Sequence, residues 1–359
     1  MHLKKIQLYN FKNFEQNEFD FDEKINCFVG NNGVGKTNIL DAVFFLSFGK
    51  SYFNNNIRQI IRFGERVFSI NGFYDFGQTD EHIHISYELD KKKIIKRNNK
   101  PYPKLAEHVG LIPLVMISPY DRDLISERGE TRRKFIDRII SQADSAYLSA
   151  LIAYQKVLSQ RNRLLKYFAA NHRFDADTLS VYNEQLHEYG TVIYYKRKKF
   201  LSDFSLFLKQ KYEVLSSGKE QVDIIYQSHL QEDKLINLLS DNIQKDRILQ
   251  HTTKGIHRDD FVFSINERLI RKFGSQGQQK SFLIALRLAE FQFLKKKATQ
   301  TPILLFDDIF DKLDENRVAQ IIQMVNDKTF GQIFISDTHA ERTEQLVKKI
   351  HQSYKVYYL

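Results

Sequence analysis

Short apolar or alternating segments predict β-strands in three parts of the chain. The first part, residues 1–30, contains KKIQLYNF, FEQNEFDF and INCFVG. In the second, residues 66–99, VFSINGFYDF, HIHISYEL and IIKRN alternate with period two and are separated by the turn-like segments DKKK and NNK, which predicts an antiparallel layer. The third, LIPLVMISP at 111–119, is an apolar run typical of a buried strand.

The spacing of apolar residues changes to that of a helix from about 121 to 215, where proline is absent. One apolar series runs from Ile136 to Ile152 and a second from Leu179 to Phe207. Between them, the polar segment AANHRFDADT at 169–178 predicts a turn. We therefore expect an antiparallel arm of two long helices, rich in lysine and arginine.

After a polar stretch near 216–250, strand and helix patterns alternate again to residue 359. This order predicts an α/β domain in two parts, residues 1–120 and 246–359, with a helical arm domain inserted at 121–245. No run approaches the roughly 18 to 20 apolar residues that span a bilayer. The first residues lack the apolar core of a signal peptide, and the single cysteine, Cys27, excludes an intramolecular disulfide. We therefore expect a cytoplasmic protein without a membrane partner.

The segment GNNGVGKT lies between a predicted strand and a predicted helix and matches the phosphate-loop pattern G-x-x-x-x-G-K-[ST]. Such a loop turns backbone N–H groups toward phosphates at a helix N-terminus. Lys36 would neutralise the β- and γ-phosphates, and the Thr37 hydroxyl would bind Mg²⁺. The alternative is a glycine-rich turn with an incidental lysine. The expected ATP-binding residues are Gly30, Asn31, Asn32, Gly33, Val34, Gly35, Lys36 and Thr37.

Two further strand ends carry candidate chemistry. In PILLFDDIFDKLDENR (302–317), a buried strand delivers Asp307, the expected Mg²⁺ carboxylate, and Asp308, the expected base for the attacking water. Adjacent acids at a strand end can also be helix caps. The strand QIFISDTH ends at His339, which would face the γ-phosphate if the strands are parallel. A surface histidine is the alternative.

The stretch KFGSQGQQKSFLIALRLAE (272–290) places a polar entrance before an apolar helix. A helix N-terminus carries partial positive charge, and Ser275 and Gly277 add a hydroxyl and an unobstructed backbone. Because the phosphate loop already has its own helix N-terminus, this second one suits an ATP held by another copy. Two copies would then bury two ATP molecules in a symmetric dimer. The alternative is an ordinary capped amphipathic helix.

The net charge is +10, from 54 Lys and Arg against 44 Asp and Glu, which favours a polyanionic partner such as nucleic acid. A generally basic, solvated surface is the alternative. KKKIIKR (91–97) forms a basic hairpin that either contacts DNA or is simply solvated. GIHRDD (255–260) is expected to be an ion-paired loop. His82 and His84 share one strand face, but the sequence offers no further ligand at a suitable spacing for metal.

The order of these motifs resembles the ABC-type ATPases of chromosome maintenance, and among them the RecF family of bacterial recombination-repair ATPases. The matching blocks run from end to end: LYNFKNF, FVGNNGVGKTNILDAV, ISPYDRDLI, TRRKFID, GIHRDDFVFSIN, FGSQGQQKSFLIALRLAE and LLFDDIFDKLDENR. The resemblance implies a P-loop ABC-type ATPase head with an antiparallel β layer, interrupted by the helical arm. It also makes His339 the switch histidine and places Asp314 in the D-loop. The signature motif would be Gly274, Ser275, Gln276, Gly277 and Gln278.

The resemblance further implies an ATP- and Mg²⁺-dependent homodimer that binds double-stranded DNA and single-strand junctions without sequence specificity. Slow hydrolysis would release the dimer. Roles in DNA replication, gap repair and the SOS response follow, with a RecR-like accessory protein. Two alternatives remain open: a DNA clamp that binds ATP without hydrolysing it, and the ATP-binding subunit of a transporter.

Three features depart from the family pattern or leave a contact open. Tyr120 stands in SPYD where the family more often has an acid. Asp311 and Lys312 occupy places where serine and an acid are expected. Tyr9 and Phe11 are both candidates for stacking on adenine, and either could instead belong to the core.

Overall fold

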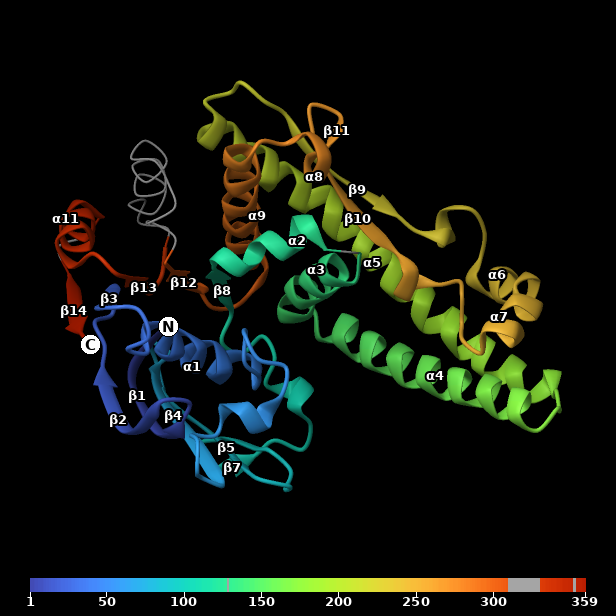
Figure 1. Cartoon of the computed structure of the whole chain (residues 1–359), viewed down its shortest axis with the longest axis horizontal. Helices are drawn as coiled ribbons and strands as arrows, with labels where there is room; N and C mark the ends of the chain where they lie inside the picture. The colour runs from blue at the N-terminus through green and yellow to red at the C-terminus, as the bar shows by residue number, and fades with distance from the viewer. Residues whose placement is uncertain (128, 309–329, 351–352) are drawn as a thin grey trace. The chain divides into compact units, whose positions relative to one another are not determined.

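The computed structural model describes residues 1–127, 129–308, 330–350 and 353–359. Within it the chain packs as two units (Figure 1). Unit 1 consists of Met1–Asp121 and Glu290–Leu359, and unit 2 of Arg122–Ala289. Asp311, Lys312 and Asp314 lie outside the described residues.

Unit 1 contains an antiparallel sheet of six strands in the order β2-β1-β4-β5-β6-β7. Buried and half-buried residues alternate strictly along β4, as expected of a sheet with one face on a core. The predicted antiparallel layer is therefore confirmed. The strands are β1 His2–Phe11, β2 Phe14–Asp20, β4 Val67–Asp75, β5 Asp80–Glu88, β6 Ile94–Arg97 and β7 Lys100–Pro101.

A second sheet of unit 1 has five strands, all parallel, in the order β14-β3-β13-β12-β8. Its three central strands are buried throughout, in keeping with their mostly apolar sequences. The order brings β3 from one end of the chain beside β13 from the other. The strands are β3 Ile25–Val29, β8 Leu114–Ile117, β12 Ile303–Asp307, β13 Ile333–Asp337 and β14 Tyr354–Tyr358.

The helix α1 (Lys36–Phe48) contacts strands of both sheets and has almost no solvent-facing side. Its apolar side chains join one core cluster with residues of the two sheets, including Phe11, Phe28 and Phe68. A helix enclosed in this way needs apolar residues all round rather than a stripe. Another helix, α11 (Ala340–Ile350), packs against β3 and β14.

Unit 2 contains the predicted helical arm, in which α4 (Ser145–Ala170) and α5 (Ala176–Ser216) lie side by side (Figure 1). Asp144 caps α4 through the backbone N–H of Tyr147, and Asp175 caps α5 through two backbone N–H groups. The expected turn at 169–178 coincides with the gap between the two helices. Two shorter helices precede them, α2 (Asp123–Ser126) and α3 (Gly129–Ala143).

The segment near 216–250 is more structured than its polar composition suggested. Val222, Ile224 and Tyr226 alternate along a strand, β9, whose partner is β10 in a sheet of order β11-β10-β9. Through this pairing β10, which lies beyond the predicted domain boundary at 245/246, belongs to the same unit as the arm. The packing division consequently falls at 289/290, whereas the sequence placed the boundary at 245/246.

The remaining elements of this region, in chain order, are β9 Val222–Gln227, α6 Leu235–Asp241, α7 Ile243–Leu249, β10 Asp260–Ile265, β11 Arg268–Leu269, α8 Ile270–Phe273 and α9 Gln276–Lys297. Five short 3₁₀ helices complete the described secondary structure: Ile57–Ile60, Leu105–Glu107, Pro119–Arg122, His229–Gln231 and Ile256–Arg258.

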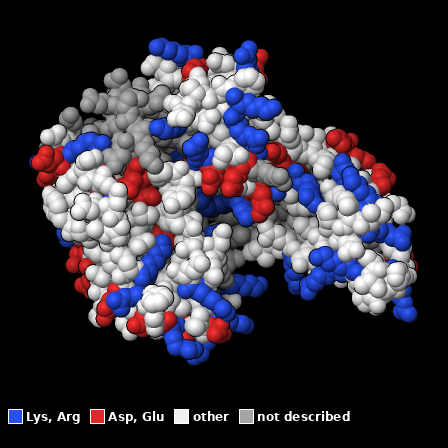
Figure 2. Space-filling view, in the orientation of Figure 1, with Lys and Arg blue, Asp and Glu red and all other residues white. Residues whose placement is uncertain are grey.

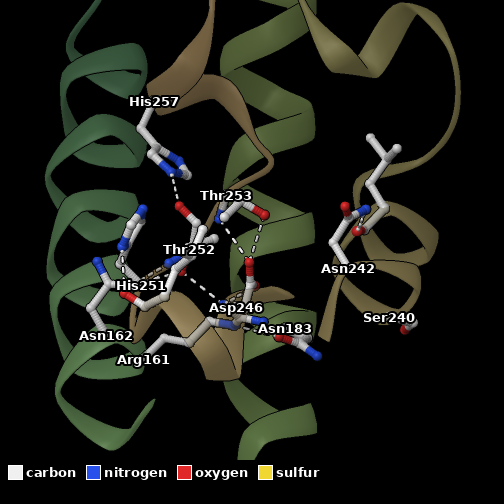
Figure 3. A network of polar contacts seen from close by, with 12 residues as sticks. Arg161, Asn162, Asn183, Ser240, Asn242, Asp246, His251, Thr252, Thr253 and His257 are labelled. Atoms are coloured by element: carbon white, nitrogen blue, oxygen red, sulfur yellow. Dashed lines mark hydrogen bonds and ion pairs between the residues drawn. The ribbon is translucent and has the colours of Figure 1, made fainter. Parts of the chain in front are cut away.

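A buried polar network joins α4, α5 and α7 within unit 2 (Figure 3). The guanidinium of Arg161 donates to Asp246 at 2.7 Å, to Asn183 at 2.7 Å and to Thr252 at 2.8 Å. The other carboxylate oxygen of Asp246 accepts two hydrogen bonds from Thr253. Arg161 and Asp246 are both fully buried. Removing either partner would leave an uncompensated buried charge, which costs about 3–5 kcal/mol.

The expectation of an ion-paired GIHRDD loop is confirmed. Asp259 accepts from Arg197 at 2.8 Å and from the hydroxyl of Tyr226, and Asp260 pairs with Arg132 at 2.8 Å. Burial raises the pKa of Asp259 despite the neighbouring Arg197 guanidinium. These pairs fasten the loop to α3, α5 and β9 inside unit 2.

Candidate nucleotide site

The candidate site of unit 1 lies at one edge of the parallel sheet. Since β3, β13, β12 and β8 run in the same direction as neighbours, their carboxyl ends meet there. The residues that follow or end these strands are Gly30, Thr338, Asp307 and Ser118. Ligands in open α/β sheets bind outside the carboxyl ends of the strands.

The loop between β3 and α1 depends on glycine at two positions. Gly33 has φ +87° and Gly35 has φ +114°, conformations that side-chain-bearing residues rarely adopt. At Gly35 a Cβ would also come within 2.6 Å of the Asn13 side-chain nitrogen. Asn13 in turn donates to the carbonyl of Val34 and accepts from Asn38 of α1. The β1–β2 turn thus supports the loop.

The ammonium of Lys36 folds back over this loop. It donates to the carbonyl oxygens of Gly30 at 2.8 Å and Asn31 at 2.9 Å, and the residue is only 4% exposed. This position, at the N-terminus of α1 and inside the curl of the loop, is one from which a lysine can bind phosphate oxygens.

Asp307 accepts hydrogen bonds from three hydroxyl groups. Thr37 donates to one carboxylate oxygen at 2.8 Å and Ser336 to the same oxygen at 2.9 Å, while Ser118 donates to the other at 3.1 Å. Thr37 and Asp307, predicted as the two protein ligands of Mg²⁺, are therefore adjacent. A hydroxyl and one carboxylate are the hard oxygen donors with which Mg²⁺ is held beside phosphates and water. Among the described residues there is no cluster of three or more acids, histidines or cysteines for a metal, which this kind of Mg²⁺ site does not require.

Asp308 and His339 occupy the neighbouring strand ends. Asp308 has φ +46°, and its backbone N–H donates to Ser336. His339 is exposed at the start of α11, where its backbone N–H donates to the buried carboxylate of Asp337. Asp337 also accepts from Arg342 and Thr343. This carboxylate fixes the turn that carries His339.

Sequence reasoning missed Ser118, Ser336 and Asn13. Both serines come at or near the end of an apolar strand, as Asp307 does, so the available signal was a polar residue at a strand end. Ser118 also connects Asp307 to Asp121, which accepts from the Ser118 backbone N–H and from the hydroxyl of Tyr52.

The predicted signature residues lie in unit 2, where Gly274 and Ser275 join α8 to α9 and Gln276, Gly277 and Gln278 form the first turn of α9. Ser275 is exposed and caps α9: its hydroxyl oxygen accepts from the backbone N–H of Gln278 at 3.2 Å. The Gln278 side chain returns a contact, accepting from the Ser275 backbone N–H at 2.6 Å. This is a reciprocal capping box. The local contacts are therefore those of an ordinary capped helix, the alternative named above. In this arrangement the Ser275 hydroxyl oxygen accepts a hydrogen bond, and its proton can still be donated to another group.

Other sequence candidates have local partners. His82 and His84 both contact the side-chain oxygen of Asn71, at 3.0 and 2.9 Å. In the basic hairpin, Arg97 forms an ion pair with Glu81 and Lys93 donates to the carbonyl of Gly49. These contacts give two cations of the hairpin partners within unit 1, although the Arg97 side chain stays 40% exposed.

The two candidates for stacking on adenine, Tyr9 and Phe11, differ in exposure, and Tyr120, the departure from the family pattern, lies on the surface. Tyr9 is 46% exposed and Tyr120 64%, whereas Phe11 is fully buried. Phe11 packs edge-on against Phe45 and Phe68 in the core. An adenine ring could not stack on it without opening that core.

The arm offers a different basic surface. The α4 sequence contains no Asp or Glu, and Lys156, Arg163 and Lys166 are exposed on one side of the helix. Figure 2 shows Lys and Arg side chains gathered in the region of α4. Within the described part of the chain, no helix is both long and apolar enough to cross a membrane.

Residues 2–358 match the family model described as the RecF/RecN/SMC N terminal domain. A curated relative from Flavobacterium johnsoniae, "DNA replication and repair protein RecF", is 58% identical over 359 residues and covers 100% of both chains. A protein of the same description from Parabacteroides distasonis is 46% identical over 357 residues, with 99% of this chain and 97% of the relative covered.

The chain is also similar to solved structures of RecF proteins. The recombination mediator protein RecF–ATPrS in the RecFOR pathway matches with a TM-score of 0.88 at 30% identity, over 100% of this chain and 96% of that one. The corresponding RecF–ATP structure gives 0.87 at 32% identity, over 94% and 92%. An Smc head domain from Pyrococcus furiosus, at 16% identity and TM-score 0.58 over 97% and 92%, shares the fold.

Proposed function

Because this chain belongs to the RecF family of DNA replication and repair proteins, with the head fold of an ABC-type ATPase, we propose that it is an ATP-dependent dimer that binds gapped DNA. The predicted fold class agrees with the family and with the two sheets and helical arm described above. One observation carries the proposal: Thr37 and Asp307, from opposite ends of the sequence, meet beside a glycine-dependent loop that matches the phosphate-loop pattern.

The residues of unit 1 divide the work at the triphosphate. Gly30–Thr37 would bind the phosphates through backbone N–H groups and Lys36, and Thr37 and Asp307 would hold Mg²⁺. When bound, the metal supplies charge neutralisation for the phosphates. Asp308 would accept the proton of the attacking water, and the exposed His339 would lie at the γ-phosphate.

The signature residues Gly274–Gln278 would complete the site of a second copy. The exposed Ser275 hydroxyl, with its proton free, and the N-terminus of α9 are suited to an anion. Each copy would then give a phosphate loop to one ATP and a signature to the other, in a symmetric pair. Hydrolysis would separate the copies, and its slow rate would set how long they stay together.

The exposed cations of α4 support phosphate contacts with DNA that are independent of sequence. The RecFOR pathway named for the solved relatives supports a RecR-like protein as a partner. Single-strand/double-strand junctions as the DNA substrate belong to the same proposal. Participation in the SOS response and a cytoplasmic location belong to the same proposal.

Two other functions are weaker. A transporter subunit would need a membrane partner, and the end-to-end similarity to DNA repair proteins argues against it. A clamp that binds ATP without hydrolysis would not need Asp308 beside Asp307. Phosphate release from ATP by the purified chain separates hydrolysis from simple binding.

The decisive measurement is the mass of the purified chain by light scattering with and without ATP and Mg²⁺, repeated with gapped DNA. The wild-type chain should double in mass with ATP. Lys36→Ala should lose both nucleotide binding and dimer formation. Ser275→Arg should bind ATP yet stay monomeric, and a normal ATP-dependent dimer of this variant would overturn the assignment of the signature.

A further inference from the structure

The Gln278 side chain connects the signature to a carboxylate that sequence reasoning did not single out. Its amide nitrogen donates to Glu220 at 2.6 Å, and its amide oxygen accepts from the Ser275 backbone N–H at 2.6 Å. An amide has one donating and one accepting end. Since Glu220 as a carboxylate only accepts, it determines which end of the amide faces Ser275.

Glu220 is itself held in place. It lies in the loop between α5 and β9, and its second carboxylate oxygen accepts from the hydroxyl of Tyr212. Tyr212 is 1% exposed and its ring lies 6.4 Å from that of Phe282 in α9. The next residue, Gln221, exchanges hydrogen bonds with Asn266 in the β10–β11 turn. The carboxylate therefore has a fixed position relative to the start of α9.

We propose that Glu220 is a positioning residue for the signature motif, an inference that rests on the function proposed above. Glu220 orients the Gln278 amide, and the amide holds the Ser275 backbone. The Ser275 hydroxyl oxygen is then occupied by the backbone N–H of Gln278, so its proton is directed outward to the partner's γ-phosphate. Loss of Glu220 frees the amide to rotate and leaves Ser275 without a fixed orientation.

The negative charge of Glu220, taken alone, would affect the stability of the dimer in the opposite direction from its positioning role. A carboxylate near the phosphate of the partner repels it, so its removal would strengthen the dimer by electrostatics. Positioning predicts a weaker dimer instead. Glu220→Gln separates the two effects: its amide oxygen can still accept from Gln278 and its amide nitrogen can donate to the Tyr212 oxygen, but the charge is gone.

The test combines dimer formation with amide hydrogen exchange of the full chain. We expect Glu220→Ala to raise the dimer dissociation constant with ATP roughly tenfold, as loss of a hydrogen bond to a charged group does. Exchange in the peptide covering 271–283 should become faster in this variant before nucleotide is added. Glu220→Gln should restore both values. Glu267→Ala, which removes an exposed acid from the β10–β11 turn, is the matched charge control and should change neither. Melting temperature checks that each variant is folded.

Each outcome has a distinct meaning. An unchanged exchange rate or an unchanged or tighter dimer in folded Glu220→Ala overturns the role of Glu220. Equal loss in Glu220→Gln and Glu220→Ala would show that hydrogen bonding by the side chain at position 220 does not hold the signature, and overturns the role as well. A wild-type chain that stays monomeric with ATP instead refutes the proposed function, because the reference dimer itself is then missing.

Discussion

The hydroxyl of Thr37 donates a 2.8 Å hydrogen bond to Asp307, although 270 positions separate the two residues in the sequence. The contact exists because β3 and β12 flank β13 in one parallel sheet. Two further hydroxyls, from Ser118 and Ser336, restrain the same carboxylate. Its orientation is therefore set before a metal arrives, as expected of a preorganised site.

Ser118→Ala should raise the Mg²⁺ concentration needed for half-maximal ATP hydrolysis about three- to tenfold, in keeping with the loss of one hydrogen bond. The reason is that one oxygen of Asp307 loses the hydroxyl donor that it has among the described residues, so the carboxylate can rotate. A Mg²⁺ titration at saturating ATP measures the change. Ser126→Ala removes an exposed serine whose hydroxyl donates to the backbone carbonyl of Arg122, away from Asp307, and should match wild type. Equal Mg²⁺ dependence in both variants would show that Ser118 does not orient Asp307.

Asp308→Asn should abolish phosphate release while ATP binding and the dimer persist. The amide cannot accept a proton from water, but it keeps the shape of the side chain. Asparagine also tolerates left-handed backbone conformations, so the φ of +46° at this position is preserved. Light scattering after ATP addition should show a dimer that no longer decays. Hydrolysis at the wild-type rate would assign the base to another residue.

Neutralising Lys156, Arg163 and Lys166 together with glutamine should weaken DNA binding and reduce its salt dependence. If each contacts one phosphate, the slope of log affinity against log salt should become shallower by about 2.7. Binding of labelled gapped DNA over a range of salt concentrations gives this slope. Lys91→Gln with Lys92→Gln, in the hairpin of unit 1, is the comparison variant. An unchanged slope in the α4 variant would place the DNA elsewhere.

His257 should make the free energy of unfolding depend on pH below neutrality. Its Nε2 lies 3.1 Å from the carbonyl of Thr252, which can only accept, so Nε2 carries the proton and Nδ1 accepts from the Tyr154 hydroxyl at 2.8 Å. Burial lowers the pKa of His257 to about 3, from an ordinary value of 6.5. Between these values the unfolded chain binds more protons, so the free energy of unfolding falls as the pH is lowered through that window, by at most about 1.4 kcal/mol per pH unit.

Denaturant unfolding at about pH 7 and about pH 5 measures this loss, a range in which an ordinary histidine changes charge. His257→Gln should lose less stability between the two conditions than wild type does. His172→Gln, in the exposed turn after α4, should behave like wild type. If both variants lose as much stability as wild type, His257 is not the group that takes up the proton.

The sequence predicted those parts of the candidate site whose residues are consecutive in the chain. Gly30–Thr37 and Asp307–Asp308 each combine an apolar strand with its own polar end, so local pattern was enough. Ser118, Ser336 and Asn13 belong to separate elements that only tertiary packing brings to the loop and to Asp307. No local signal distinguishes such a serine from any other at the end of a strand.

The same limit applies to the organisation of the chain. The two sheets and the paired arm helices follow from periodicity, whereas the pairing of β9 with β10 does not. Val222, Ile224 and Tyr226 alternate as a strand should, but they lie within a stretch that is polar overall, and the strand is not apparent from composition. Because that pairing was missed, residues 246–289 were assigned to the head, although they pack with the arm.

The enclosure of α1 between two sheets has a consequence for how the protein can respond to nucleotide. Tilting this helix would separate Phe44, Phe45 and Leu46 from their neighbours, and exposing even one such side chain costs several kcal/mol, about as much as an Ala substitution there. Displacement of the helix that follows the phosphate loop by a bound triphosphate would therefore cost several kcal/mol. The backbone amides of α1 beyond its first turn should exchange with deuterium only when unit 1 unfolds as a whole, with or without ATP.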